Sequence, residues 1–301
     1  MSDNSKIEWC DATWSPIRAR SKTSGKVFHW CEKISSGCAH CYAATMAQRF
    51  GLPDYVKANR DKVEFFLDDA MLRRPLHWKR PRRIFVESCS DLFGDWVPEE
   101  WLDDCFRAMA RAEQHVFQVL TKRPERALDY CKKRWGHFDG REYPPLPNIW
   151  LGVSVEDQQR ANERIPLLLQ TPAALRFLSC EPLLEMVDLT RCYSYTEDAF
   201  FNAFQGQYCG LDGWGSLDWV ICGGESGPQA RPFLLEWAEF LRDQATAAGV
   251  PYFLKQLGSA PRRLTGLGVA RVLVLKDSKG GDPAEWDEAL RVREFPRTAP
   301  R

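Results

Sequence analysis

Short apolar runs alternate with helical patterns along most of this chain, and this alternation constrains its fold more than any other feature. From about residue 60 onward, runs rich in β-branched and aromatic residues end abruptly in polar residues and are followed by helix-like segments. Successive runs lie mostly about 25–40 residues apart, the length of a strand–helix–strand unit. Their near-continuous apolarity is typical of parallel strands buried on both faces. The runs are Val63–Leu67, Arg83–Glu87, Val116–Leu120, Asn148–Val153, Leu175–Ser179, Asp218–Cys222 and Pro251–Leu254.

The segments between these runs carry helix signals. Pro98 stands at a predicted first helical position, and apolar residues then recur at helical spacing. Pro232 opens a later helix, which Gly249 terminates. With Ile7–Thr13 as a first strand, the predicted strands number eight. The pattern predicts an α/β fold, a (βα)8-like or partly open TIM-type barrel with parallel strands; a doubly wound open sheet is the alternative.

The strand–helix cadence breaks at two places. Residues 190–216 form an aromatic and Gly-rich insertion before the seventh strand, and long insertions of this kind are often functional loops. After Gly258, a basic connector leads to Val272–Leu275 and a charged tail. We therefore expect residues 1–258 to form the barrel, with a cysteine loop at 31–41 and the insertion at 190–216. Residues 259–301 are expected to form a C-terminal surface extension.

Charge and hydropathy exclude some classes of protein. Lys plus Arg equals Asp plus Glu, at 41 each, so the chain has no overall positive field that would indicate a nucleic-acid partner. No stretch approaches the roughly 20 apolar residues that a membrane helix needs. The polar segment Met1–Lys6 does not have the pattern of a signal peptide. We expect a cytoplasmic protein without membrane contact.

Cysteine usage gives the strongest chemical signal. Eleven cysteines in a chain expected to lie in a reducing compartment favour metal binding over a disulfide framework. Cys31, Cys38 and Cys41 follow the spacing C-x6-C-x2-C, directly before a predicted helix that ends at Gly51, and no fourth cysteine is close in sequence. Soft thiolates suit zinc or iron–sulfur clusters. A closed zinc site needs four ligands, whereas a 4Fe–4S cluster on three thiolates leaves one iron free to bind S-adenosylmethionine.

Two other interpretations of these cysteines stay open from spacing alone. His29 or His40 can complete a Cys3His zinc site, and the cysteines can also be unligated and buried. The loop follows the first predicted strand, at the end of the barrel where active sites are built. This position favours catalysis over a peripheral zinc site.

Further motifs run in order over nearly the whole chain. They are Lys6–Pro16 (KIEWCDATWSP), Gly37–Ala43 (GCAHCYA), Ser90–Phe93 (SDLF), Leu120–Pro124 (LTKRP), Trp150–Glu156 (WLGVSVE), Ser179–Pro182 (SCEP), Gly223–Gly227 (GGESG) and Gly280–Trp286 (GGDPAEW). With these motifs the chain resembles a phage- and prophage-associated three-cysteine-motif protein family related to radical S-adenosylmethionine enzymes.

The resemblance implies a 4Fe–4S cluster on Cys31, Cys38 and Cys41, reductive cleavage of S-adenosylmethionine, and an external electron donor. The chain departs from the family where Cys10 stands in place of Thr and where Ile17–Trp30 forms an insertion. The first cysteine gap is also longer than in the commonest radical enzymes, which have C-x3-C-x2-C.

Barrel active sites collect polar residues at the carboxyl ends of strands, and the predicted strand ends carry such residues here. Asp91 follows one strand, and the Gly-Gly pair after another lets the backbone approach a ligand closely. His40 occupies the position where radical enzymes often place an aromatic residue that seats adenine. The residues predicted to bind S-adenosylmethionine are His40, Ser88, Lys122, Arg123, Ser154, Glu156, Gly223, Gly224 and Glu225.

These residues have predicted roles that follow from the groups of the cofactor. Lys122 or Arg123 suits the carboxylate, Arg with the better fork geometry. Glu225 suits the ammonium group, and Ser154 with Glu156 suits the ribose hydroxyls. Each also has a structural interpretation, because polar strand ends, Gly-Gly turns and basic helix starts are routine.

Cys180 and Glu181 are the predicted catalytic pair. A thiol is a good hydrogen-atom donor, so Cys180 beside Glu181 is expected to quench a substrate radical. The alternative is that Cys180 is a small buried core residue.

Two basic stretches suggest a nucleic-acid substrate. Arg73–Arg83 has six Lys or Arg and no acid, and Lys122–Arg134 has six against two acids. Basic stretches with aromatic residues suit phosphate contacts and base stacking, although most charge runs are solvated helix faces. The leading hypothesis is a radical S-adenosylmethionine enzyme with an unidentified substrate, which the basic stretches suggest is a nucleic acid. The alternatives are a zinc-stabilised, non-catalytic nucleic-acid-binding protein and an iron–sulfur redox-sensing protein.

Overall fold

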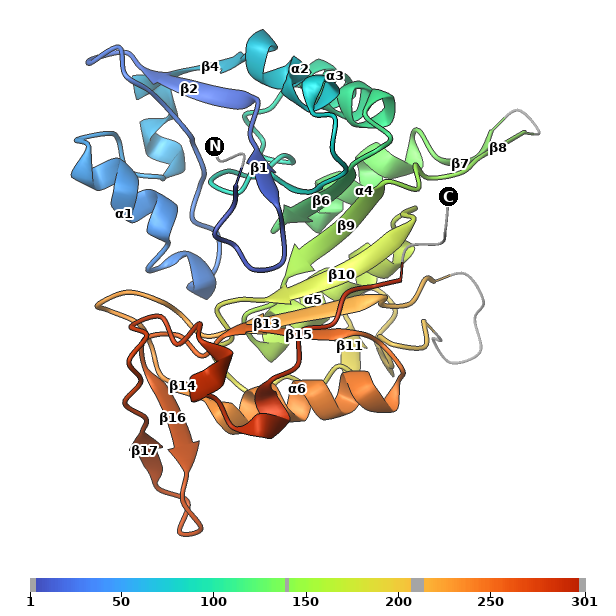
Figure 1. The fold of residues 1–301 in the computed structure, drawn as a ribbon. Helices are drawn as coiled ribbons and strands as arrows, with labels where there is room; N and C mark the ends of the chain where they lie inside the picture. The colour runs from blue at the N-terminus through green and yellow to red at the C-terminus, as the bar shows by residue number, and fades with distance from the viewer. Residues whose placement is uncertain (1–3, 139–140, 207–213, 298–301) are drawn as a thin grey trace. The chain divides into compact units, whose positions relative to one another are not determined.

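The computed structural model describes residues 4–138, 141–206 and 214–297 (Figure 1). Contacts divide the chain into two compact units. The first comprises residues 1–151 and 172–174, and the second comprises residues 152–171 and 175–301. The whole cysteine loop, residues 31–41, belongs to the first unit.

Seven parallel strands form the principal sheet. In sheet order they are β1 (Ala12–Trp14), β5 (Arg83–Val86), β6 (Val116–Thr121), β9 (Ile149–Ser154), β10 (Leu175–Cys180), β13 (Trp219–Gly223) and β15 (Tyr252–Gln256). The predicted class, an α/β fold of the partly open TIM-barrel type with parallel strands, is confirmed. The doubly wound alternative is wrong, because strand order in such a sheet reverses at a switch point, whereas this order follows the chain.

One predicted barrel strand lies outside this sheet. β4 (Val63–Leu67) pairs antiparallel with β2 (Ile17–Ser21), which also pairs with β3 (Val27–Phe28). Within β4 only Val63 is buried, so the strand lacks the two covered faces that its apolar sequence indicated. The prediction of eight parallel strands is therefore wrong by one for the described chain. The segment Ile17–Trp30, which departs from the family as an insertion, contains the β2–β3 hairpin.

The first unit carries four α-helices and two 3-10 turns among its described residues. Helix α3 begins at Glu99, one residue later than predicted because Pro98 has extended backbone and is its N-cap, and it buries Leu102, Cys105 and Met109 along one face. The hairpin strands β7 (Gly136–Phe138) and β8 (Arg141–Tyr143) follow the last helix. The helices and turns are η1 (Ser36–Cys38), α1 (Tyr42–Arg49), η2 (Lys57–Lys62), α2 (Asp69–His77), α3 (Glu99–Arg111) and α4 (Pro124–Lys132).

Among its described residues the second unit has two α-helices, and the predicted insertion contributes a small antiparallel pair. Within residues 190–216, strand β11 (Cys192–Ser194) pairs with β12 (Ala199–Phe201). A separate three-stranded sheet joins β14, β16 and β17. The remaining elements are α5 (Gln158–Gln170), β14 (Phe233–Leu234), α6 (Leu235–Ala247), β16 (Pro261–Leu264), β17 (Ala270–Val272), η3 (Pro283–Glu285) and η4 (Glu288–Leu290).

The segment after residue 258, expected to be a surface extension, returns to the sheet. Leu254, in β15, donates its N–H to Val292 O (2.8 Å). The side chains of Trp286 and Leu290 in the same C-terminal segment are buried. An edge strand leaves backbone groups unpaired unless another segment covers them. Residues 290–294 supply that cover for β15, so this segment is part of the second unit's core.

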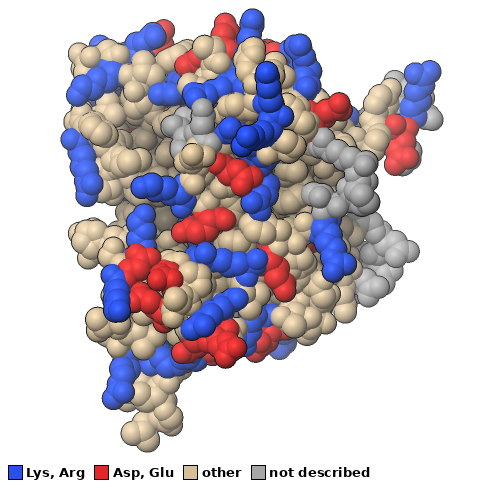
Figure 2. Space-filling view, in the orientation of Figure 1, with Lys and Arg blue, Asp and Glu red and all other residues tan. Residues whose placement is uncertain are grey.

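The surface is mixed in charge. Lys and Arg side chains lie among Asp and Glu over the lower part of the face drawn in Figure 2, whereas Lys and Arg predominate at its left, over the region of α1. No helix in the described ranges is long and apolar enough to cross a membrane.

Gly152, in the middle of β9, provides a test of core packing. A Cβ at Gly152 would lie 2.6 Å from the ring of Phe177, which is fully buried and cannot move aside cheaply. We expect Gly152→Ala to lower the free energy of unfolding by about 1–3 kcal/mol, measured by urea denaturation. Gly266→Ala is the matched control, because a Cβ there meets nothing within 4 Å. Equal losses of stability in the two variants would contradict a close contact between position 152 and the Phe177 ring.

Candidate functional site

The three cysteines of the loop lie together in the first unit. Cys38 ends the turn η1, and Cys41 is the N-cap of α1. Cys38 is buried, whereas Cys31 and Cys41 are half-buried. Cys38 and Cys41 are close enough to Cys31 to act on its titration electrostatically. The loop and the helix start therefore gather the three thiols that the spacing singles out.

The loop is anchored on both sides of Cys31. Trp30 is buried against the ring of Tyr55, with 5.6 Å between ring centroids. Ser90 Oγ donates to Trp30 O (2.5 Å), which ties the loop to the segment after β5. The buried carboxylate of Glu32 accepts from Arg60 Nη2 (2.7 Å). These contacts hold the residues that flank Cys31 and so restrict its thiol.

Asp91 joins two strand-end loops beside the cysteines. Its buried carboxylate accepts from Thr121 Oγ1 (2.7 Å), Lys122 N (3.1 Å) and Arg123 Nη1 (2.8 Å). The Arg123 guanidinium also lies 4.9 Å from the centre of the Trp96 ring. Arg123 is therefore a structural partner of Asp91, with its charge already neutralised.

The surrounding charges act oppositely on two of the thiols. Burial, followed by the carboxylate of Asp91, raises the pKa of Cys31 well above the ordinary thiol value. Burial also acts to raise the pKa of Cys38, but the Lys122 ammonium and hydrogen bonds in the loop outweigh it and lower that pKa. Lys122 Nζ donates to Ser35 Oγ (3.4 Å), which lies 3.6 Å from Cys38 Sγ. Lys122 thus favours the thiolate at Cys38, and the thiolate is the metal-binding form.

A fourth thiol lies near this group. Cys89, in the loop after β5, interacts electrostatically with Cys41. Its Sγ is 3.6 Å from Tyr42 Oη, which also donates to Ser88 O (2.5 Å). Ser88, a predicted cofactor residue, is half-buried at this same loop. The sequence places Cys89 at or just beyond a strand end, but spacing does not group it with the cysteine loop, because it lies 47 positions after Tyr42.

The donor set of the loop fits a thiolate-held cluster. In a 4Fe–4S cluster each thiolate binds a different iron, so the sulfurs need not converge on a single ion. Within the described ranges, no group of three or more His, Cys, Asp or Glu side chains is arranged to hold one metal ion. His40 is half-buried between the second and third cysteines. Burial, together with Arg18, lowers the pKa of His29 to about 3, so its imidazole is neutral.

Glu87 is a buried carboxyl that sequence reasoning did not select. It directly follows β5, is 2% exposed, and has a positive φ of 53° that non-glycine residues rarely adopt. Its Oε1 accepts from Ile17 N (2.9 Å), and its Oε2 has no hydrogen-bond partner among the residues that the structure describes. Burial and the neighbouring Asp91 raise the pKa of Glu87 to about 8, against the opposing effect of Arg18. At neutral pH this side chain is mainly a neutral acid.

In the second unit, the predicted catalytic pair lies at the end of β10. Cys180 is fully buried, and burial raises the pKa of its thiol far above the ordinary value, so the S–H bond is retained. Glu181 Oε1 lies 2.9 Å from Lys255 Nζ, and its Oε2 accepts from Ser179 Oγ (3.1 Å). The carboxylate of this pair is therefore already held by a lysine.

Two predicted cofactor carboxylates are committed to arginines. Glu156 is fully buried, and its Oε2 lies 2.8 Å from Arg164 Nη1, which also donates to the backbone oxygen of Ser154 (2.8 Å). Glu225 accepts from Arg231 at both oxygens, with Nη2–Oε1 at 2.7 Å and Nε–Oε2 at 3.0 Å. These ion pairs give both carboxylates a structural role.

The glycine pair Gly223–Gly224 also has a packing explanation. A Cβ at Gly224 would lie 2.3 Å from Leu257 O, so the chain passes too closely there for any side chain. Gly223 ends β13 at an irregularity in its register with β15. The close approach that the sequence suggested for a ligand is in the structure an approach between two backbone segments.

Much of the basic stretch Lys122–Arg134 is neutralised within the first unit. Arg134 Nη2 lies 3.2 Å from Glu99 Oε1 and also contacts Asp103, and Lys133 Nζ lies 3.2 Å from Glu99 Oε2. In Arg73–Arg83, Arg83 pairs with Asp11 at 3.0 Å. Three exposed cations of this stretch, Arg73, Lys79 and Arg80, keep their side chains at the surface.

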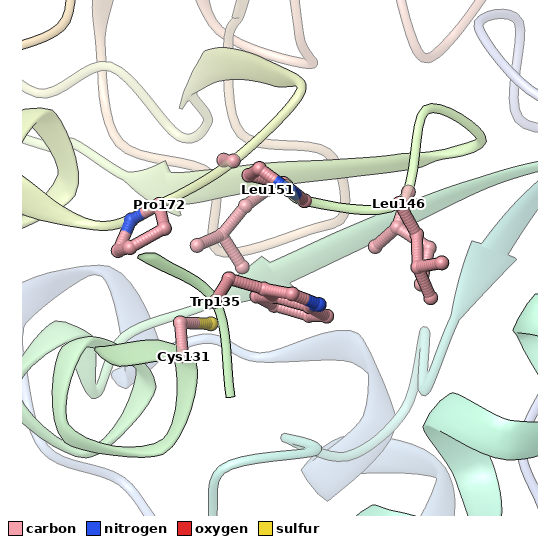
Figure 3. A pocket seen from close by; sticks show the side chains of 8 residues that line it. Cys131, Trp135, Leu146, Leu151 and Pro172 are labelled. Carbon is pink, nitrogen blue, oxygen red and sulfur yellow. The ribbon is translucent and has the colours of Figure 1, made fainter. Parts of the chain in front are cut away.

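Two cavities in the described part of the chain are lined by residues outside the predicted site. The first is a small apolar pocket in the first unit, of about 10 Å³, in which Cys131 and Trp135 face Leu151 and Pro172 (Figure 3). The second, of about 620 Å³, lies beside the insertion and is lined in part by Gln244. The amide of Gln244 already bonds the backbone at Val187 and Leu189.

Glu87 makes stability depend on pH in a defined direction. The unfolded carboxyl has its usual pKa of 4.5, whereas the folded pKa is about 8. The protonated Glu87 therefore makes its full contribution to the free energy of unfolding below about pH 4.5, and this contribution is lost as pH rises through about 8. The free energy of unfolding of the natural chain, compared with that of Glu87→Gln, should therefore fall as pH rises from about 4.5 to about 8. The fall is at most about 1.4 kcal/mol per pH unit. Urea denaturation at several pH values measures the difference.

The control for this prediction is Glu113→Gln, because Glu113 is exposed. This variant should keep a constant offset from the natural chain at every pH. Stability curves of the natural chain and Glu87→Gln that run parallel would contradict a protonated Glu87.

Asp91→Ala should destabilise the first unit strongly. The substitution leaves Arg123 buried without its carboxylate, and an uncompensated buried charge costs about 3–5 kcal/mol. Thermal and urea unfolding measure this loss. Asp95→Ala is the matched control: its side chain is 59% exposed although it pairs with Arg60, so we expect at most about 1 kcal/mol. Similar losses for the two variants would refute the proposed role of Asp91.

Comparison with known proteins places the chain in a family. No curated protein and no solved structure matches it. Residues 4–289 match a family that is described as "Protein of unknown function (DUF5131)", which covers both units and every candidate residue above. The chain therefore belongs to the DUF5131 family.

Proposed function

We propose that this protein is a radical S-adenosylmethionine-type enzyme in which Cys31, Cys38 and Cys41 hold a 4Fe–4S cluster. The observation that supports this most is the gathering of three thiols at the start of α1, where Lys122 favours the thiolate of Cys38. When bound, such a cluster supplies an open iron for the amino and carboxylate groups of S-adenosylmethionine and the electron for reductive cleavage of a C–S bond.

Lys122 is the better candidate for the cofactor carboxylate. Its ammonium lies beside the cysteine loop, 3.4 Å from Ser35 Oγ, and a lysine offers three donors. Arg123 has the better geometry for a carboxylate in general, but its guanidinium is buried against Asp91 and Trp96. In this proposal Lys122 orients the cofactor and Arg123 orients the loop that carries Lys122.

In the second unit, the proposal assigns the catalytic role to Cys180 and Glu181. The buried Cys180 keeps its proton, which is the form that donates a hydrogen atom, and Glu181 is held beside it by Lys255. The proposal also keeps Ser154, Glu156, Gly223, Gly224 and Glu225 as cofactor residues. The carboxylates of Glu156 and Glu225 are paired with arginines, and Gly224 packs against the backbone of Leu257. A cytoplasmic location, an external electron donor and a nucleic-acid substrate complete the proposal.

The test is anaerobic reconstitution with iron and sulfide. The natural chain should turn brown, bind about four irons, and show an electron paramagnetic resonance spectrum that changes with S-adenosylmethionine. With dithionite it should release 5′-deoxyadenosine. Cys31→Ala, Cys38→Ala and Cys41→Ala should each lose most of the iron, whereas Cys131→Ala, on α4, should keep it.

Other outcomes identify the alternatives. Colourless protein with one zinc per chain indicates the zinc-stabilised nucleic-acid binder. Full iron content with a spectrum that does not respond to S-adenosylmethionine indicates the redox sensor. An intact cluster that yields no 5′-deoxyadenosine under dithionite would rule out the radical mechanism.

A further inference from the structure

Helix α1 presents its large apolar side chains to solvent. Tyr42, Met46 and Phe50 recur every fourth residue, at the start, middle and C-cap of the helix, and are 53%, 43% and 63% exposed. The alanines of the same helix form its buried side. We call the surface of Tyr42, Met46 and Phe50 the α1 face.

The segment that carries the α1 face is positively charged in a chain with no net charge. Residues 26–62 contain six Lys or Arg and three Asp or Glu, an excess of three positive charges. One of the acids, Glu32, is neutralised by Arg60. Lys33, Arg49 and Lys57 are exposed, and Lys and Arg side chains lie over the region of α1 in Figure 2. Asp54 accepts from Gln48 Nε2 of the same helix (2.7 Å), so the surround of the apolar stripe is cationic on balance and includes one carboxylate.

We propose that the α1 face is the docking surface for a small, acidic, one-electron carrier protein that reduces the cluster. This inference rests on the proposed function. Transient redox complexes have small interfaces, with an apolar centre and complementary charges at the rim that steer association. The helix begins directly after Cys41, so a carrier on this face lies next to the thiols. One electron passes from the carrier to the oxidised cluster, and no proton or group is transferred.

Charge and position favour this occupant over two others. A second copy of the chain would bring two cationic rims together, and like charges across an interface oppose association. A nucleic acid would match the cations and could stack on Tyr42 and Phe50. The position of the face, on the helix that begins directly after Cys41, favours a carrier instead, because an electron donor must dock close to the thiols. An acidic protein complements both the rim and the apolar centre.

The probe for the test is a reduced plant-type [2Fe–2S] ferredoxin, an acidic carrier. Calorimetry measures its affinity for the natural chain, and stopped-flow spectroscopy measures reduction of the reconstituted protein. Met46→Glu with Phe50→Glu should weaken binding and slow reduction by ferredoxin by at least about tenfold, and Arg49→Glu with Lys57→Glu should do so most at low salt. Reduction by dithionite should stay unchanged in all variants, because this small reductant needs no docking surface.

Leu267→Glu is the matched control, since Leu267 is a strongly exposed apolar residue in the turn between β16 and β17. It should leave ferredoxin binding unchanged, and circular dichroism should show every variant folded. Binding is measured with or without a cluster, so failure to form 5′-deoxyadenosine with dithionite counts against the proposed function alone.

Three outcomes overturn the docking proposal. The first is ferredoxin affinity that is unchanged in the α1-face variants. The second is a dimer of the natural chain, seen by sedimentation, that the same variants dissociate. The third is single-stranded DNA that binds the natural chain and loses affinity with these substitutions.

Discussion

The arrangement of the first unit depends on the buried ion pair between Asp91 and Arg123. One carboxylate receives the Arg123 guanidinium, the Thr121 hydroxyl and the Lys122 amide, so a single side chain joins the loop after β5 to the end of β6. Neither charge can remain buried alone without a large penalty. Asp91 also holds the backbone amide of Lys122, the residue whose ammonium lowers the pKa of Cys38.

The architecture was predictable where burial on both faces leaves a continuous apolar run. Runs such as Val116–Leu120 and Leu175–Ser179 correspond to central parallel strands, because only apolar residues suit both covered faces. Val63–Leu67 has the same composition yet forms an antiparallel pair with one buried residue. Composition shows that a run is strand-like, but the partner strand depends on contacts distant in sequence, such as Phe65 with Trp30.

The site was predictable to the extent that its residues are close in sequence. Cysteine spacing identifies the thiol loop, and strand ends identify Lys122. Arginine partners of Glu156 and Glu225 were not foreseeable, because no regular spacing links a strand end to Arg164 or to Arg231. Glu87 escaped notice for a related reason: its burial follows from how β1 and β5 pair, and a glutamate after a strand normally faces water.

The order of the strands along the sheet has a consequence for the synthesis of the chain. Every pairing within the seven-stranded sheet joins strands that are neighbours in synthesis order. Chains emerge from the ribosome with the N-terminus first and fold by domains as they emerge. The cysteine loop, Asp91 and Arg123 all lie within the first 123 residues. A nascent chain therefore already contains the cysteine loop and the Asp91–Arg123 pair beside it before translation reaches the second unit at residue 152.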